Sequence, residues 1–182
     1  MTHSQQSRPA AFIDRDGTLI RDVDYLSSTD DLEVFDFSRK ALEMLRENDY
    51  LIIVVTNQSG IGRGFFDSQT VVAINAEMNQ RLGGLIDAFY FCPHLPDDGC
   101  ECRKPSAGLI RNAMNDLEID IANSWTIGDK ASDIELGMNA GTATALVLTG
   151  YGESELPDLG RMPDVVAANL LAAVNEICSR DD

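Results

Sequence analysis

Residues 10–20 read AAFIDRDGTLI, a short apolar run that ends in two aspartates separated by one arginine. The apolar residues 10–13 are typical of a strand buried on both faces, and Asp14 and Asp16 follow at its end. Gly17 lets the backbone bend directly afterwards. Two carboxylates in this place are either the charged residues of a capped turn or part of a reaction centre, and the rest of the chain decides between these interpretations.

Apolar runs of strand length alternate with helical patterns along the chain. The other predicted strands are residues 50–57, 88–92, 124–129 and 142–150. Helices are predicted over 38–47, after a cap at Asp67 or Ser68, after a cap at Ser106, after a capping box of Ser132 and Glu135, and over about 168–179. This alternation predicts one α/β, Rossmann-like domain over residues 10–182, with a mostly parallel sheet and helices on both faces. Residues 1–9 are expected to form a flexible arm and the polar stretch 151–164 a surface loop.

Polar residues follow four of the predicted strands at the point where each strand ends. They are Asp14 to Asp16, Thr56 to Gly60, Arg103 and Lys104 after a cysteine-rich loop, and Gly128 to Lys130. Ligands of such sheets bind outside the carboxyl ends of the strands, so these residues are expected to share one site. Three aspartates gathered there need a positive partner, and Mg²⁺ suits a site that also holds phosphate.

This set of residues suits phosphoryl transfer. Asp14, fixed at the end of the strand, is the better nucleophile and would form an aspartyl-phosphate. Asp16, on the turn, would protonate the leaving oxygen and then take a proton from water. Thr56, Lys104 and Lys130 would supply donors and positive charge to the phosphate. Asp133 is expected to support the start of its own helix or to orient Lys130 rather than to bind metal.

The stretches FIDRDGT, VVTNQSG, RKP and IGDKASD resemble, in order, the four motifs of the haloacid dehalogenase superfamily, and the resemblance covers roughly residues 10–150. It implies that Asp14 is the nucleophile, Asp16 the general acid/base, and Thr56 and Lys104 the pair that stabilises phosphate. It also implies that Asp14, Asp129 and the backbone carbonyl of Asp16 hold Mg²⁺. The segments between 18 and 35 and between 60 and 87 leave no room for the large cap domain that many members carry.

The loop CPHLPDDGCEC, residues 92–102, contains the pattern C-x-H-x5-C-x-C. Three thiolates and one imidazole complete a tetrahedral zinc site with no open position, so Cys92, His94, Cys100 and Cys102 are predicted to bind a structural Zn²⁺ that positions Lys104. The alternative is four reduced side chains without metal. Cys178 is remote from this loop, and His3 in the N-terminal arm is assigned no role.

A Cys-x-His…Cys-x-Cys loop before Arg-Lys-Pro resembles a small branch of the superfamily that contains heptose bisphosphate phosphatases and histidinol-phosphate phosphatases. By this resemblance, eight residues are expected to line the site of the sugar and its second phosphate: Arg15, Asp22, Tyr25, Asn57, Gln58, Ser59, Arg103 and Lys130. The implied reaction removes the 7-phosphate of D-glycero-D-manno-heptose 1,7-bisphosphate. Alternatives are hydrolysis of histidinol phosphate and, less favoured, a sugar-phosphate-binding domain without catalysis. Taken without the resemblance, Arg15 is expected to point to solvent.

The chain of 182 residues has a formal net charge of −16. This charge disfavours nucleic acids and anionic membranes as partners, since both are bound by basic patches. The polar start MTHSQQSRPA has no apolar core of a signal peptide, and the longest apolar stretch, residues 50–55, is too short to span a bilayer. The expectation is a cytoplasmic monomer that acts on a small sugar phosphate.

Overall fold

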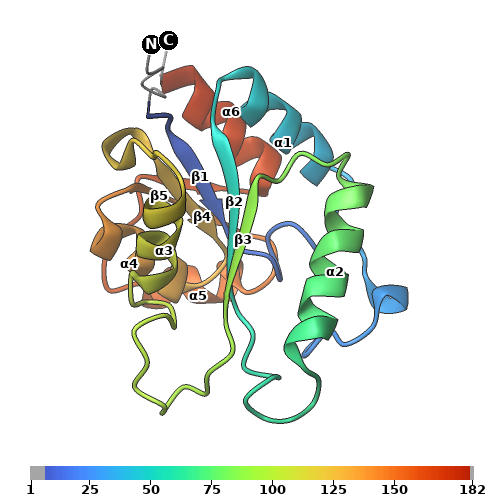
Figure 1. Ribbon diagram of the computed structural model, residues 1–182. Helices are drawn as coiled ribbons and strands as arrows, with labels where there is room; N and C mark the ends of the chain where they lie inside the picture. Colours follow the sequence, from blue (N-terminus) through green and yellow to red (C-terminus); the bar gives the residue numbers. More distant parts are fainter. Residues whose placement is uncertain (1–6, 181–182) are drawn as a thin grey trace, which may run out of the picture.

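Six parallel strands form one sheet in the order β3-β2-β1-β4-β5-β6 in the computed structural model, which describes residues 7–180 (Figure 1). The strands are β1 (Ala10–Ile13), β2 (Leu51–Asn57), β3 (Ala88–Cys92), β4 (Trp125–Gly128), β5 (Ala143–Val147) and β6 (Val165–Ala167). The predicted α/β, Rossmann-like class with a parallel sheet is therefore confirmed.

β1 lies at the centre of the sheet because its four residues are apolar on both faces. All four are completely buried between β2 and β4, with Phe12 opposite Ile53 on one side and Thr126 on the other. The β-branched, apolar β2 is buried in the same way along most of its length. This central position makes the end of β1 a rigid support for the residues that follow it.

Helices cover both faces of the sheet, as predicted (Figure 1). The helices are α1 (Ser38–Glu47), α2 (Ser68–Arg81), α3 (Gly108–Asp116), α4 (Ala131–Ala140), α5 (Gly152–Glu155) and α6 (Leu170–Arg180). Side chains of α1, α2 and α6 pack with Ile13 and Val54 on one face, whereas α3 and α4 pack with Phe12 and Ile53 on the other. Short 3-10 turns lie at Thr29–Asp31, Ile121–Asn123 and Leu156–Asp158. None of the helices within residues 7–180 is long and apolar enough to cross a membrane.

Two predicted helix starts are wrong, and a third is confirmed. The N-terminus of α3 has no side-chain cap, so Ser106 does not cap it. α4 begins at Ala131, and the N–H of its N-cap Lys130 donates to Asp133 Oδ2 at 3.1 Å. Asp133 therefore supports the helix start, as one interpretation of the sequence held, and the capping box of Ser132 and Glu135 does not form. α2 is capped by Asp67 as predicted.

Two further segments differ from the prediction. The stretch 151–164 contains α5 and a 3-10 turn, and it leads into β6, a strand too short to give an alternating pattern. Within the predicted N-terminal arm, Arg8 exchanges backbone hydrogen bonds with residues 118 and 120, and Pro9 accepts one from Leu51. Residues 1–6, with His3, lie outside the described part of the chain.

Candidate active site

A cavity of about 350 Å³ lies at the carboxyl ends of β1, β2 and β4. Figure 1 shows the loops that follow β2 and β3 leaving the sheet at this edge. The cavity is lined by both predicted catalytic aspartates, by the predicted phosphate pair and by all eight predicted substrate residues: Asp14, Arg15, Asp16, Asp22, Tyr25, Thr56, Asn57, Gln58, Ser59, Arg103, Lys104 and Lys130. The structure therefore brings together at one edge residues that lie far apart in the sequence.

Lys104 links two buried aspartates at the base of the cavity. Its Nζ lies 2.6 Å from Asp14 Oδ1 and 2.6 Å from Asp133 Oδ1, and it donates to the carbonyl of Val55 at 3.1 Å. Burial raises the pKa of Asp14, whereas the positive charge of Lys104 lowers it. The negative charge of Asp133 raises it further, and the net shift is upward. Burial lowers the pKa of Lys104, but Asp133 and Asp14 outweigh it and the net shift is upward. The lysine therefore stays charged and holds Asp14 in a fixed orientation.

Asp129 lies close to Asp14 and Asp133. Its side chain is completely buried, and Oδ2 accepts the N–H of Tyr151 at 2.8 Å. Oδ1 is buried with no hydrogen-bond partner among residues 7–180. A Cβ on Gly17 or Gly150 would lie 2.3 Å or 2.1 Å from Oδ2, so only glycine fits at these two positions. Burial, with the charges of Asp14 and Asp133, raises the pKa of Asp129 to about 8.

These carboxylates could hold a hard cation. Oxygens of Asp14, Asp129 and Asp133 lie within 4.8 Å of one another. Asp133 is occupied, because Oδ1 faces Lys104 and Oδ2 accepts the N–H of Lys130. Asp14 and Asp129 are the two carboxylates left for a metal. The unpartnered Oδ1 of Asp129 and the like charges around it fit a divalent ion with oxygen ligands.

Asp16 is surrounded by hydrogen-bond donors. Its Oδ2 accepts from Arg15 Nε at 3.0 Å and from Gln58 Nε2 at 2.9 Å, and Thr56 Oγ1 lies 3.5 Å away. Its Oδ1 accepts from Arg15 Nη2 at 3.1 Å. The expectation that Arg15 points to solvent is wrong, because its side chain is only 1% exposed and its charge is matched by the partly buried carboxylate of Asp16.

Two predicted substrate residues are engaged in holding the loop that carries Lys104. Asn57 Oδ1 accepts the N–H of Lys104 at 3.1 Å, and Asn57 Nδ2 donates to its carbonyl at 3.3 Å. Arg103 Nη1 donates to the carbonyl of His94 at 3.1 Å, which ties this cavity-lining guanidinium to the cysteine loop. The strand end and the cysteine loop together therefore set the position of the Arg103–Lys104 pair.

Aromatic and cationic side chains form part of the cavity wall, here called the rim, which includes Tyr25, Lys130 and Tyr151. Lys130 Nζ lies 3.3 Å from Asp22 Oδ2 and 4.6 Å from the ring centroid of Tyr151. Tyr25 contacts the exposed ring of Phe65 edge to face, with centroids 5.0 Å apart. The sequence did not predict a role for Tyr151 or Phe65, since neither belongs to a motif. The position of Tyr151, directly after the end of the fifth predicted strand at Gly150, is the sequence signal that could have indicated its place at the cavity.

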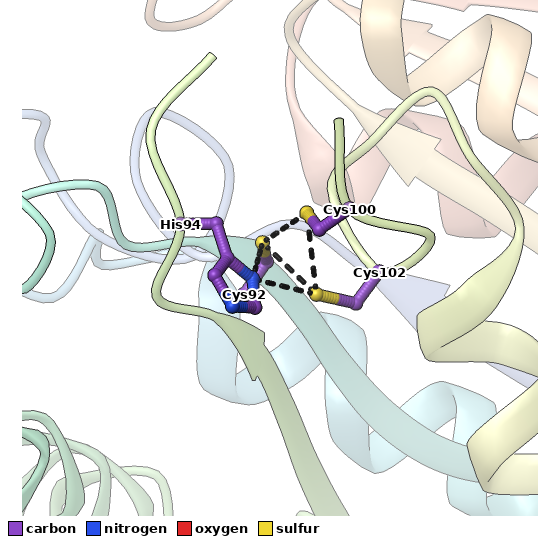
Figure 2. A group of neighbouring side chains, drawn as sticks. All are labelled: Cys92, His94, Cys100 and Cys102. Carbon is purple, nitrogen blue, oxygen red and sulfur yellow. Dashed lines mark hydrogen bonds between the residues drawn. The ribbon is translucent and has the colours of Figure 1, made fainter. Parts of the chain in front are cut away.

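Cys92, His94, Cys100 and Cys102 converge on one point (Figure 2). The sulfur–sulfur distances are 3.2–3.6 Å, and His94 Nδ1 lies 3.2 Å from Cys102 and 3.5 Å from Cys92. Zn–S bonds of about 2.3 Å in a regular tetrahedron give S–S edges of about 3.8 Å, so the four donors fit a zinc ion after a small expansion. The cysteines form no disulfide.

The arrangement of the four side chains also shifts the pKa values of the Cys92 and Cys100 thiols. Burial raises the pKa of Cys92 to about 12, with smaller contributions from the neighbouring thiols. Slight burial of Cys100 is outweighed by a backbone hydrogen bond from Arg103 and by bonds to Cys92 and Cys102, which lower its pKa to about 7. One thiolate is therefore available near neutral pH, while a metal must displace the proton of Cys92.

Known proteins resemble this chain in both fold and sequence. Residues 101–173 match the family model described as HAD-hydrolase-like. The chain is 41% identical over 177 residues to the D-glycero-beta-D-manno-heptose-1,7-bisphosphate 7-phosphatase of Haemophilus ducreyi, which covers 92% of this chain and 97% of that protein. The chain belongs to the HAD-like hydrolase family. The resemblance predicted from its four motifs is thereby confirmed.

Other relatives of this HAD-like chain carry similar names. It is 43% identical over 146 residues to the probable D-glycero-D-manno-heptose-1,7-bisphosphate 7-phosphatase of Thermoplasma acidophilum, covering 78% of this chain and 91% of the relative. The crystal structure of D,D-heptose 1,7-bisphosphate phosphatase from B. bronchiseptica, complexed with magnesium and phosphate, superposes with a TM-score of 0.86 at 34% identity. That match covers 94% of this chain and 99% of the other. The homologues of this chain are thus phosphatases of the HAD-like family.

Proposed function

We propose that this protein is a Mg²⁺-dependent phosphatase that removes the 7-phosphate from D-glycero-D-manno-heptose 1,7-bisphosphate and releases heptose 1-phosphate. The observation that carries the proposal is the buried set of Asp14, Lys104 and Asp129: Asp14 and Lys104 line an open cavity, and Asp129 lies beside Asp14 with an unpartnered carboxylate oxygen among the described residues. The names of several relatives that match most of the chain supply the substrate.

The reaction proceeds in two transfers. A carboxylate oxygen of Asp14 attacks phosphorus, the bond between phosphorus and the sugar oxygen breaks, and Asp16 donates its proton to that oxygen. Asp16 then takes a proton from water, which attacks phosphorus and releases inorganic phosphate and the Asp14 carboxylate. Lys104 and Thr56 stabilise the charge on the phosphoryl oxygens. When bound by Asp14, Asp129 and the carbonyl of Asp16, Mg²⁺ would supply the positive charge that lets a carboxylate approach a phosphate.

The cavity suits a substrate with two phosphates. Arg103 and Lys130 line it at positions other than that of the buried Lys104, and a guanidinium binds phosphate with two parallel hydrogen bonds. Burial opposes the charged form of Lys130, but the carboxylates of Asp14, Asp129 and Asp22 raise its pKa, so it remains a cation. These local cations overcome the repulsion that a net charge of −16 exerts on an anion.

A comparison of two substrates tests the proposal. With Mg²⁺ present, kcat/KM for heptose 1,7-bisphosphate is expected to exceed that for L-histidinol phosphate and for generic phosphate esters by at least about a hundredfold. The difference in kcat/KM is expected because a monophosphate has no second phosphate to pair with Arg103 and Lys130. Arg103→Met should lower kcat/KM for the bisphosphate much more than for histidinol phosphate. A preference for histidinol phosphate would transfer the proposal to that substrate, the alternative that the sequence left open.

Stability should respond to Mg²⁺ more strongly at higher pH. The folded state holds the Asp129 proton more tightly than the unfolded chain, since burial raises its pKa to about 8. The metal-free protein is therefore stabilised below the ordinary aspartate pKa, and this contribution is lost as the pH rises through about 8. Mg²⁺ takes the place of the proton, so its increase in Tm should be larger at about pH 8 than at about pH 5.

Asp129→Asn provides the control for that measurement. Its amide does not titrate, so the metal-free variant should lose less stability between the two pH values, and Mg²⁺ should raise its Tm little at either. Thermal unfolding of both proteins with and without Mg²⁺ measures the effect. An equal increase in Tm at both pH values in the wild type would argue against metal binding at Asp129.

We also propose that Cys92, His94, Cys100 and Cys102 hold a structural zinc ion. Cys102→Ser is expected to reduce bound zinc from about one equivalent to less than about a tenth, and to lower Tm by about 5–10 °C, because the loop loses the metal that joins its two ends. Elemental analysis and thermal unfolding measure both effects. Cys178→Ser, a thiol outside the cluster, should keep the zinc. Wild-type protein purified without chelator and found free of zinc would contradict the proposal.

The remaining expectations from the sequence are proposals of the same kind. We place the reaction in the cytoplasm, where three neighbouring thiols stay reduced and can bind metal. The only partner required is the small sugar phosphate, and the acidic net charge speaks against nucleic acid. A monomer satisfies the site, because every residue invoked comes from one chain.

A further inference from the structure

Arg15 lies between the two proposed reacting aspartates, yet it faces only one of them. Its Nε donates to Asp16 Oδ2 at 3.0 Å and its Nη2 to Asp16 Oδ1 at 3.1 Å, so the guanidinium grips both carboxylate oxygens. The Arg15 side chain is 1% exposed, whereas that of Asp16 is 17% exposed toward the cavity. The buried guanidinium therefore fixes the orientation of the Asp16 carboxylate, which is partly exposed toward the cavity.

The guanidinium is itself held by two other elements of the fold. Arg15 Nη1 donates to Asn75 Oδ1, on α2, at 3.2 Å, and Nη2 donates to Gln58 Oε1, after β2, at 3.0 Å. Gln58 Nε2 reaches back to Asp16 Oδ2 at 2.9 Å and to Thr56 Oγ1 at 2.8 Å. The side chains of these residues form a closed network that orients the carboxylate of Asp16 from three segments of the chain.

The chemistry of these groups decides what the network can do. A guanidinium presents N–H donors in a planar fork that matches a carboxylate, so Arg15 suits binding and orienting Asp16. Burying such a charge is costly unless the charge is fully paired. If Arg15 served only to fill space in the core, an apolar side chain would do so without this cost. The pairing ends at Asp16, the one group proposed to move protons. A general acid must lie within hydrogen-bond reach of the leaving oxygen, and small misplacements cost about a hundredfold in rate.

We propose that Arg15 is a positioning residue that fixes the carboxylate of Asp16 for proton transfer to the leaving oxygen, with Asn75 and Gln58 as its anchors. The inference rests on the proposed function in that Asp16 is taken as the general acid/base. It replaces the substrate-binding role that the sequence suggested for Arg15, since all three guanidinium nitrogens are already engaged within the network.

The dependence of the rate on the leaving group separates positioning from a general loss of structure. p-Nitrophenolate leaves without a proton, whereas a sugar alkoxide needs one. kcat/KM covers only the steps up to release of the leaving group, so both substrates report the step in which Asp16 is the acid. For Arg15→Met with Mg²⁺, the loss of kcat/KM on an alkyl phosphate should exceed the loss on p-nitrophenyl phosphate by at least about 30-fold. Equal losses on both would overturn the proposal.

Two further measurements keep the inference testable if the first variant is unstable or inactive. Asn75→Leu removes only the outer anchor of Arg15, so its loss of kcat/KM on an alkyl phosphate should also exceed its loss on p-nitrophenyl phosphate, but by a smaller factor of about three to ten. In a crystal structure of Arg15→Met, the Asp16 carboxylate should move away from Thr56 and Gln58, and an unmoved carboxylate would overturn the proposal. The alkyl substrates should be heptose 1,7-bisphosphate and glycerol 2-phosphate. Wild-type cleavage of the second alone would reject the proposed substrate while leaving the Arg15 test intact.

Discussion

Asp14→Asn is expected to lower kcat by at least about four orders of magnitude while the protein stays folded. The amide oxygen is too weak a nucleophile to attack phosphorus, so no aspartyl-phosphate forms. Asparagine has the same shape, and its Oδ1 can still accept from Lys104, which now lies 2.6 Å from that atom of Asp14. Steady-state kinetics and circular dichroism measure the two parts of this prediction.

Asp133→Asn is the matched control for Asp14. Asp133 is equally buried and lies at the same distance from Lys104, but its oxygens are taken by Lys104 and by the N–H of Lys130. It therefore has no part in bond formation, and its replacement should lower kcat only about 10- to 100-fold through the altered position of Lys104. If the two variants lost activity equally, Asp14 would not be the nucleophile.

Lys104→Met should damage both stability and catalysis. Lys104 is nearly inaccessible to solvent and neutralises Asp14 and Asp133. Removing one partner of a buried ionic cluster leaves uncompensated charge, so the free energy of unfolding should fall by about 3–5 kcal/mol. The lost contact to the phosphoryl group should lower kcat/KM at least about a hundredfold. Chemical denaturation and kinetics with a phosphate ester measure the two effects.

A second substitution separates the two losses. Adding Asp133→Asn to Lys104→Met removes one of the uncompensated charges, so part of the stability should return while the activity does not. Lys130→Met, which removes a half-exposed cation at the rim, should cost much less stability. A double variant no more stable than Lys104→Met would show that the carboxylates near Lys104 are not coupled through it.

The sequence predicted the centre of the site because its residues are adjacent to strand ends. Asp14 and Asp129 each come directly after a short buried strand, and parallel strands bring their carboxyl ends to one edge. The same reasoning predicted the positions of Thr56 and Lys104, and the cysteine spacing predicted that the four side chains of the cysteine loop would converge. These predictions needed only the order of strands and helices, not side-chain directions.

The role of Arg15 could not be predicted in this way. Its guanidinium is fixed by Asn75, 60 positions further along the chain, and by Gln58, 43 positions away. A charged residue between two site aspartates is equally compatible with solvent, substrate or a neighbouring carboxylate. β6 was missed for a different reason: three residues show no periodicity, and the strand exists because it pairs with β5.

Trapping of the phosphoenzyme shows whether Asp14 is the residue that attacks phosphorus. Asp16→Asn keeps the nucleophile but cannot activate water, so the aspartyl-phosphate should persist after p-nitrophenyl phosphate is added with Mg²⁺. After an acid quench, mass spectrometry should find phosphate on the peptide that contains Asp14, and none in the Asp14→Asn variant. Release of nitrophenolate without phosphate on that peptide, or phosphate on another residue, would show that Asp14 is not the nucleophile.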